Sequence, residues 1–431
     1  MQQPLTLPPG AGPGYPRYLL TLLMLSSILN HLDRNLPAIL LPAIKRDLQL
    51  SDSELGFITG LAFALFYSTI GIPMGRLADH VSRRKVLAVC LGLWSLATAV
   101  SGAAVNFIQM AIARFTVGFG EAGYAPCAHS MVSDIYPPGR RTTAFGIMAV
   151  GTPLGGVIAF LGGAWLLETV GWRWAFFALG MPGVLLAAVI WFTVKESARG
   201  AADGYVDPGK PPPFLTVVKT LFSIPAFRHC VLGTTFTGLV YTAVTIWAPS
   251  YLSRSFGMTA GEIGVWLSPA IGLGGMFGAL FGGWIADRVS AGDRRWMAWV
   301  PAISTPVGAL LGTIAYVTDN QTLAVVMIGF PLILCPVHLP IYGAILQGLA
   351  GVRMRSSFPA ISLFIAGIVG VGLGPQIVGW GSDLVRPWAG EESLRYGLMV
   401  VVPFFGLWAG MHFFFGGFHL PADFSKAKER V

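Results

Sequence analysis

Long apolar stretches separated by short polar intervals occupy most of the chain. A membrane-spanning helix needs about 20 predominantly apolar residues. By that criterion the pattern predicts an all-α membrane protein with twelve spans, at about 17–43, 53–79, 84–104, 107–134, 141–167, 172–194, 228–252, 262–287, 295–317, 321–348, 354–381 and 395–418.

One polar, Pro-rich interval divides these spans into two groups of six. It runs from Lys195 to Phe227 and contains the run Pro211 to Pro213. We expect two six-helix bundles, at 17–194 and 228–418, joined by a cytoplasmic linker at 195–227. The Pro- and Gly-rich residues 1–16 predict a disordered tail, and 419–431 a cytoplasmic one.

Composition supports a membrane protein. The 431 residues are 54% hydrophobic and 11% charged, whereas soluble domains carry about 25% charged residues. The net charge of +8 does not indicate nucleic-acid binding, because the bases form short clusters between apolar runs. The four cysteines lie inside apolar segments without metal-ligand or disulfide spacing, so we expect packing residues and no metal site.

The distribution of bases predicts the orientation. If the N-terminus is cytoplasmic, twenty of the 28 lysines and arginines fall on the inner side and six on the outer side. Cytoplasmic loops carry the excess of bases. We therefore expect both termini and the linker on the cytoplasmic side of the cell membrane. The run that begins at Tyr18 is too long for a signal-peptide core and should be retained.

A repeat relates the two groups. A shift of 208 residues brings Gly75, Asp79 and Ser82 onto Gly283, Asp287 and Ser290. The same shift matches Ser51 and Glu54 with Thr259 and Glu262, each a hydroxyl followed three residues later by an acid, as in a capping box. Matching polar positions indicate duplication of a six-helix unit.

The segment from Gly75 to Lys85 resembles the loop between helices two and three of the major facilitator superfamily. Gly283 to Arg295 resembles its second copy, and Arg114 to Gly123 the family's fourth-helix motif. The resemblance spans the whole chain and implies a secondary active transporter that works by alternating access, most simply as a monomer, and not an enzyme.

Local strings such as Tyr136-Pro137-Pro138 and the segment from Gly171 to Phe177 resemble the bacterial spinster-like branch. The organic anion symporter branch also shares the Asp-Arg pair of helix one and the Arg and Glu seven residues apart in helix four. The substrate therefore stays open between an amphiphilic or organic anion and a sugar acid. A drug-type proton antiporter is a further alternative, because residues 151–156 partly resemble its helix-five motif.

Charged residues within the predicted spans point to a pathway, because charge is costly in hydrocarbon. Helix one carries His31, Asp33 and Arg34, and helix four carries Arg114 and Glu121. Arg114 and Glu121 are two turns apart and share a face. By resemblance, Asp33 and Glu121 are the protonation candidates and Arg114 their switchable partner, so the proton is the expected coupling ion and no cofactor is expected.

Alternatives remain for these residues. A permanent salt bridge could fix helix one against helix four without coupling. Arg34 could extend to the outer face, and His31 could be a packing residue. His129 lies near the same face as Glu121. The second half has no charge deep in a span, and its candidate residues for the substrate cavity are polar or aromatic: Tyr241, Thr245, Trp247, His338 and Tyr342.

The two loops are candidate gates. We expect Gly75 to permit close helix approach, and Arg83 and Arg84 to hold the first loop on the inner side. By resemblance, Asp79 forms a cytoplasmic latch. In the second copy the corresponding residues are Gly283, Asp287 and Arg288.

An embedded enzyme would need a nucleophile–base pair or a metal constellation, and an ATP-driven pump would need a phosphate-binding loop of the form Gly-x-x-x-x-Gly-Lys-Ser/Thr. The sequence contains none of these patterns. A third alternative is a channel or a transporter-like sensor. Saturable counterflow in liposomes would identify a carrier instead.

Overall fold

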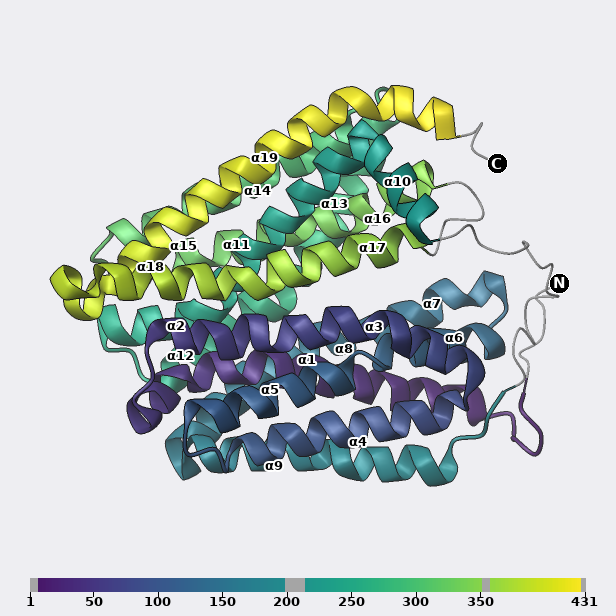
Figure 1. Ribbon diagram of the computed structural model, residues 1–431, viewed down its shortest axis with the longest axis horizontal. Helices are drawn as coiled ribbons and strands as arrows, with labels where there is room; N and C mark the ends of the chain where they lie inside the picture. Colours follow the sequence, from purple (N-terminus) through teal and green to yellow (C-terminus); the bar gives the residue numbers. More distant parts are fainter. Residues whose placement is uncertain (1–6, 198–213, 351–356, 428–431) are drawn as a thin grey trace. The chain divides into compact units, whose positions relative to one another are not determined.

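The computed structural model describes residues 7–197, 214–350 and 357–427. All regular secondary structure in these ranges is helical (Figure 1). The middle of the predicted linker, including Pro211 to Pro213, and the outermost residues of both predicted tails lie outside the described residues.

The chain forms two compact units. Unit 1 comprises Met1–Leu48 and Ala62–Asp207, and unit 2 comprises Gln49–Leu61 and Pro208–Val431. The short segment Gln49–Leu61 therefore belongs by its contacts to unit 2, although both of its ends continue into unit 1.

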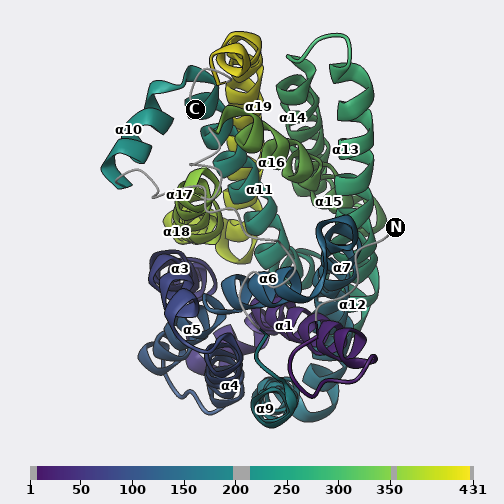
Figure 2. The same cartoon turned by 90° about the vertical axis from the view of Figure 1, so that its right-hand side faces the viewer.

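Unit 1 is a bundle around α1. Its helices are α1 (Tyr15–Leu48), α3 (Ala62–His80), α4 (Arg83–Ser101), α5 (Phe107–Glu121), α6 (Tyr124–Ile135), α7 (Pro138–Ala149), α8 (Gly151–Val157), a π-helix (Ile158–Gly162) and α9 (Gly163–Thr193). Helix α4 packs against α9 and α5, and α3 packs against α5 (Figure 2). Helix α1 packs against α8. Trp94 and Cys127 lie fully buried in its core.

Unit 2 has the remaining helices. They are α2 (Asp52–Gly56), a π-helix (Phe57–Leu61), α10 (Phe214–Ser223), α11 (Pro225–Phe256), α12 (Ala260–Pro269), a π-helix (Ala270–Gly274), α13 (Gly275–Ser290), α14 (Trp296–Val317), α15 (Gln321–Leu334), a 3₁₀ turn (Cys335–Val337), α16 (His338–Leu349), α17 (Ser357–Ile365), a π-helix (Ala366–Gly372), α18 (Leu373–Ala389), a 3₁₀ turn (Gly390–Glu392) and α19 (Ser393–Ala427). Helix α19 packs along α11 and α14, and α2 packs on α18.

Each of the twelve predicted spans overlaps at least one helix, and residues 354–356 of the eleventh span are not described. Eight helical runs of the described chain are long and apolar enough to cross a membrane. Two of these runs, Gly139–Thr193 and Phe358–Ala427, each contain two predicted spans. Gly171 marks the division inside the first run, because its φ of 85° interrupts helical geometry. Two predicted spans are not among these eight runs. One is α1, which carries internal charges. The other is divided between α5 and α6 by a break at residues 122–123.

The structure confirms the duplication. Capping boxes are complete at Ser51 with Glu54 and at Thr259 with Glu262. Helices α1 and α11 end 208 residues apart, at Leu48 and Phe256. The next residues, Gln49 and Gly257, both have a positive φ (53° and 68°). A left-handed residue after the last helical turn is a common way to end a helix, and here the same ending occurs at both repeat positions.

Candidate functional site

The charged residues of the first half meet between α1 and α5. Helix α5 lies close to α3 because Gly118 has no side chain: a Cβ there would be 2.4 Å from the carbonyl oxygen of Phe63. This approach brings the aromatic residues of α3 beside the cations. The guanidinium of Arg34 lies 4.3 Å from the ring centre of Tyr67 and 5.0 Å from that of Phe63.

Glu121 is paired with Arg34. The Nε atom of Arg34 donates to Oε2 of Glu121 at 2.5 Å. The Glu121 side chain is fully buried, and 28% of the Arg34 side chain is exposed. A partly accessible cation thus holds a buried carboxylate, so Arg34 belongs to the charged site and does not extend away from it. Arg114, expected as the switchable partner of Asp33 and Glu121, bonds the main chain of Asp33 here, and its switching stays a prediction.

Arg114 and Asp33 are both buried beside this pair. Nη1 of Arg114 donates to the main-chain carbonyl of Asp33 at 3.2 Å. Neither carboxylate oxygen of Asp33 completes a hydrogen bond among the described residues, although Thr98 and Trp94 of α4 lie beside it. A buried ionised carboxylate without hydrogen bonds is costly. Protonation would relieve that cost, so Asp33 is suited to take up a proton.

His31 joins α1 to α8. Its Nδ1 lies 3.0 Å from the carbonyl of Ser27, and its Nε2 lies 3.2 Å from Oγ1 of Thr152. Since the carbonyl can only accept, Nδ1 donates and neutral His31 accepts from Thr152 through Nε2. His129 instead packs edge-on against Phe145 at 5.2 Å. The contact of His31 therefore crosses between helices, whereas that of His129 is aromatic packing.

The polar residues proposed for the second half are mostly enclosed by unit 2. Trp247 has no exposed surface and donates from its indole to the carbonyl of Pro375 at 2.9 Å. It thus joins α11 to α18, and its role as an aromatic wall of the cavity stays a prediction. Thr245 bonds the carbonyl of Tyr241 at 2.8 Å, one turn earlier on α11.

The two predicted cavity residues of α16 also make internal contacts. Nδ1 of His338 lies 2.6 Å from the carbonyl of Cys335, and the Tyr342 hydroxyl bonds Ser362 of α17. His338 and Tyr342 are 5% and 8% exposed. The Tyr342 contact joins α16 to α17, as interhelical hydrogen bonds in helix bundles do, whereas the His338 contact is local to the start of α16.

Arg83 has a larger role than the sequence predicted. Only 2% of it is exposed, and its guanidinium pairs with Asp134 at the end of α6 and with Glu196, whose Oε1 lies 3.1 Å from Nε. It also donates to Ser130 and to the carbonyl of Ser197, both at 2.8 Å. Arg83 thus joins α4, α6 and the residues after α9 within unit 1. The sequence pattern did not single out Asp134 and Glu196 for this site; the signal for each was an acid at the end of an apolar run.

The remaining residues of the first loop differ in their surroundings. Arg84 donates to the carbonyl of Val194 at 3.0 Å. A Cβ placed on Gly75 meets no atom within 4 Å. Among the described residues, the structure therefore shows no close approach at Gly75. The side chain of Asp79 lies outside the described residues, and its latch remains a prediction.

In the second copy, two helix backbones approach closely at Gly278, which precedes the loop that begins at Gly283. A Cβ on Gly278 would lie 1.9 Å from the carbonyl oxygen of Ile333, whereas one on Gly283 would make ordinary contacts of 3.6 Å with Pro340. Asp287 is exposed and lines a small pocket of about 200 Å³ with Gly283 and Pro340. The Arg288 guanidinium lies 4.0 Å from the Trp284 ring centre.

The Arg83 network should depend on pH through Glu196. Although partial burial opposes its ionisation, hydrogen bonds from Ser82, Arg84 and Arg83 hold the pKa of Glu196 below its ordinary value. A lowered folded-state pKa gives stability that is present above the unfolded pKa of about 4.3 and is lost as pH falls through the folded value. We expect Glu196→Gln to lower the melting temperature at pH 7 and to have a progressively smaller effect below about pH 4. Thermal unfolding of both proteins across pH checks this, and an effect that grows on acidification contradicts it.

The family model described as "Major Facilitator Superfamily" matches residues 23–375. The chain belongs to the major facilitator superfamily. Members of this superfamily are membrane transporters rather than enzymes, and this chain resembles its spinster-like branch.

Three relatives show the range of the superfamily around this chain. An MFS-type efflux pump of Mycolicibacterium smegmatis is 33% identical over 387 residues, which cover 88% of this chain and 87% of the pump. Protein spinster homolog 1 of Xenopus laevis is 25% identical, covering 93% of this chain and 80% of that protein. The hexuronate transporter of Bacillus subtilis is 26% identical, covering 88% and 90%.

A solved structure has the same fold. It is a crystal structure of a bacterial homolog of the human lysosomal transporter Spinster, in an inward-facing and unoccupied conformation. The TM-score is 0.85 at 26% identity, covering 96% of this chain and 99% of the other.

Proposed function

We propose that this member of the superfamily carries an amphiphilic or organic anion across the cell membrane by alternating access, coupled to protons through Asp33 and Glu121. The observation that carries the proposal is the buried Arg34–Glu121 pair beside the Asp33 carboxylate, whose oxygens complete no hydrogen bond among the described residues. Ionisable groups inside a membrane protein usually mark such pathways.

Arg34 provides the link between proton and substrate. It is the more accessible partner of the pair, and it lies over the rings of Tyr67 and Phe63. Protonation of Glu121 would release its charge-assisted hydrogen bond. Arg34 would then be available to an anionic head group, and the two rings offer apolar contact to the rest of an amphiphile. Proton binding and anion binding are thereby coupled through one cation.

The test uses purified protein in liposomes and three labelled probes: a lysophosphatidate, glucuronate and ethidium. We expect saturable counterflow of lysophosphatidate that an imposed pH gradient accelerates. Glucuronate flux alone would instead support the sugar-acid symporter. Linear, non-saturable flux of every probe, or none at all, would reject a carrier of these classes.

Proton-driven efflux of a drug-like amphiphile is the second candidate. Its specific support is the 33% identity to an efflux pump over most of both chains. Ethidium counterflow driven by an opposing pH gradient would favour it over the anion carrier.

The topology forms part of the proposal. We infer that both termini face the cytoplasm and that the protein works as a monomer. This orientation places Arg173, Arg254, Arg386 and Arg395 on the outer side, and each forms an ion pair with a carboxylate. Reporter fusions to the C-terminus and cross-linking in liposomes test orientation and oligomeric state.

A further inference from the structure

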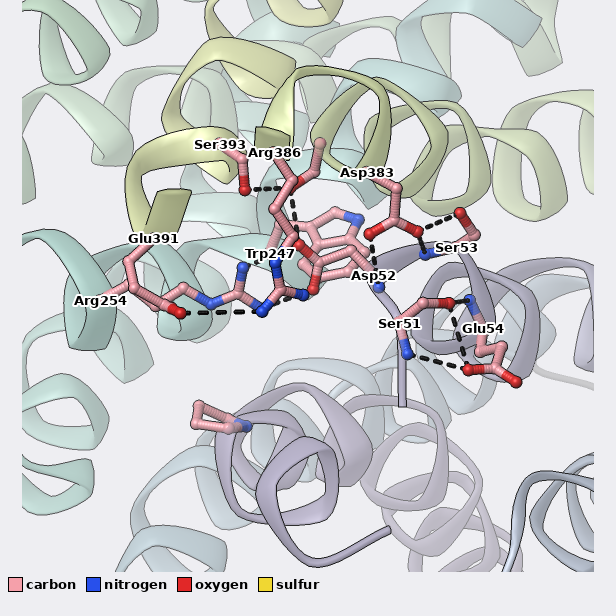
Figure 3. Close-up of polar contacts among 12 residues, drawn as sticks. Ser51, Asp52, Ser53, Glu54, Trp247, Arg254, Asp383, Arg386, Glu391 and Ser393 are labelled. Carbon is pink, nitrogen blue, oxygen red and sulfur yellow. Dashed lines mark hydrogen bonds and ion pairs between the residues drawn. The ribbon is translucent and has the colours of Figure 1, made fainter. Parts of the chain in front are cut away.

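A second buried ion pair lies at the start of α2, away from the Arg34–Glu121 site. Asp52 accepts two hydrogen bonds from Arg254 of α11, at 2.8 and 2.6 Å, and a third from Ser382 of α18 at 2.6 Å (Figure 3). The Asp52 side chain has no exposed surface, and that of Arg254 is 10% exposed. The pair is thus held in fixed geometry out of water.

Asp383 binds the same segment from α18. Its carboxylate accepts from the backbone amides of Asp52 at 3.1 Å and Ser53 at 2.8 Å, and from the Ser53 hydroxyl (Figure 3). The first amides of a helix have no partner within the helix, and negative charge is stabilised there. Asp383 therefore supplies from another helix the hydrogen-bond acceptors that the first turn of α2 lacks.

The backbone of residues 49–61 also packs closely against α18 and the π-helix before it. A Cβ on Gly379 would lie 2.3 Å from the carbonyl oxygen of Asp52, one on Gly56 2.6 Å from that of Pro375, and one on Gly60 2.3 Å from that of Gly372. At these three glycines the segment rests on α18 and the preceding π-helix with no room for a side chain between the backbones.

The repeat indicates that this ion pair is not required by the fold. In the 208-residue register, which the matched helix ends at Leu48 and Phe256 fix, Arg254 corresponds to Arg46 and Asp52 to Ala260. The capping box is kept at both positions, but the aspartate is present at only one. The fold thus forms the equivalent helix start at Thr259 without a carboxylate at the Asp52 position.

We propose that residues 49–61 are a detachable latch, which Asp52, Arg254 and Asp383 hold on unit 2 in one state and which leaves α18 in another state of the transport cycle. The segment is bound to unit 2 but continues at both ends into unit 1, at Leu48 and Ala62. Any movement that carries α18 away from the segment must break these bonds. This proposal rests on the alternating access of the proposed function.

Hydrogen exchange measures attachment directly, because Asp383 bonds two amides of the segment. We expect Asp52→Asn, Arg254→Gln and Asp383→Asn each to raise exchange in residues 50–61 by about tenfold or more, the factor for ~1.4 kcal/mol. The matched control is Asp47→Asn, which breaks the exposed pair with Arg173 at 2.9 Å and should leave this peptide within about twofold. Unchanged exchange in residues 50–61, or an equal rise throughout unit 2, overturns the latch.

Locking the segment tests whether release is needed. Ser53→Cys with Asp383→Cys places thiols at two contacting side chains, and the four native cysteines are buried. With cross-linking verified by mass spectrometry, we expect counterflow of lysophosphatidate, or of glucuronate if the wild type exchanges that probe, to stop and to return on reduction. Wild-type counterflow by the locked protein contradicts the latch. If the wild type shows counterflow of neither probe, the proposed function is rejected. The hydrogen-exchange measurement still tests the latch in that case, because it needs no transported substrate.

Discussion

Glu121→Gln is expected to reduce proton-driven uptake by about two orders of magnitude or more, as is typical when a positioned proton-transfer group is removed. Glutamine preserves the shape of the side chain and the hydrogen bond from Arg34, which lies 2.5 Å from the carboxylate. It cannot bind or release a proton. We expect Asp33→Asn to have the same effect, whereas counterflow that moves no net proton should persist in both variants.

The measurement is uptake into liposomes under a pH gradient, beside counterflow at equal pH. The control is Glu262→Gln, which replaces an exposed acid in the second capping box with another residue that completes the box. It should retain full proton-driven uptake. Wild-type uptake by both the Glu121 and Asp33 variants would exclude their role in coupling and leave a structural salt bridge.

Arg83→Met should destabilise the folded protein by about 3–5 kcal/mol, the usual cost of removing one partner from a buried ion pair. Arg83 is 2% exposed and its partner Asp134 only slightly more. Methionine fills the space but removes the ion pair that Arg83 makes with the buried Asp134 carboxylate. The apparent melting temperature in detergent should fall, and the residues after α9 should become accessible to protease because their contact with α4 is lost.

Lys85→Met is the matched control, since Lys85 lies two residues further along α4 and is exposed. It removes the same charge from the same loop and should change the melting temperature little. Equal effects of the two substitutions would show that Arg83 acts through the charge of the loop and not through its buried contacts. That outcome would restore the simpler interpretation of Arg83 as a topological anchor.

The sequence by itself determined the class and the repeat. Spans of about 20 apolar residues must be helical in a membrane, since each backbone polar group needs a partner within its segment. The matched polar positions then predicted two capping boxes, and both are present, at Ser51 and Thr259. Helical spacing also placed Arg114 and Glu121 on one face, and both are buried in unit 1.

Only the tertiary structure decided which charges pair. Asp33, Arg34, Arg114 and Glu121 allow several pairings, and the observed one depends on side-chain reach and on how closely α5 approaches α3 at Gly118.

The same limit applies to Arg83 and Asp52. Their partners Asp134 and Arg254 lie 51 and 202 residues away along the chain. Periodicity describes the faces of one helix, but it does not say which helix lies opposite. The chain pattern therefore identifies candidate charged residues, and only the packing of the helices decides which of them meet.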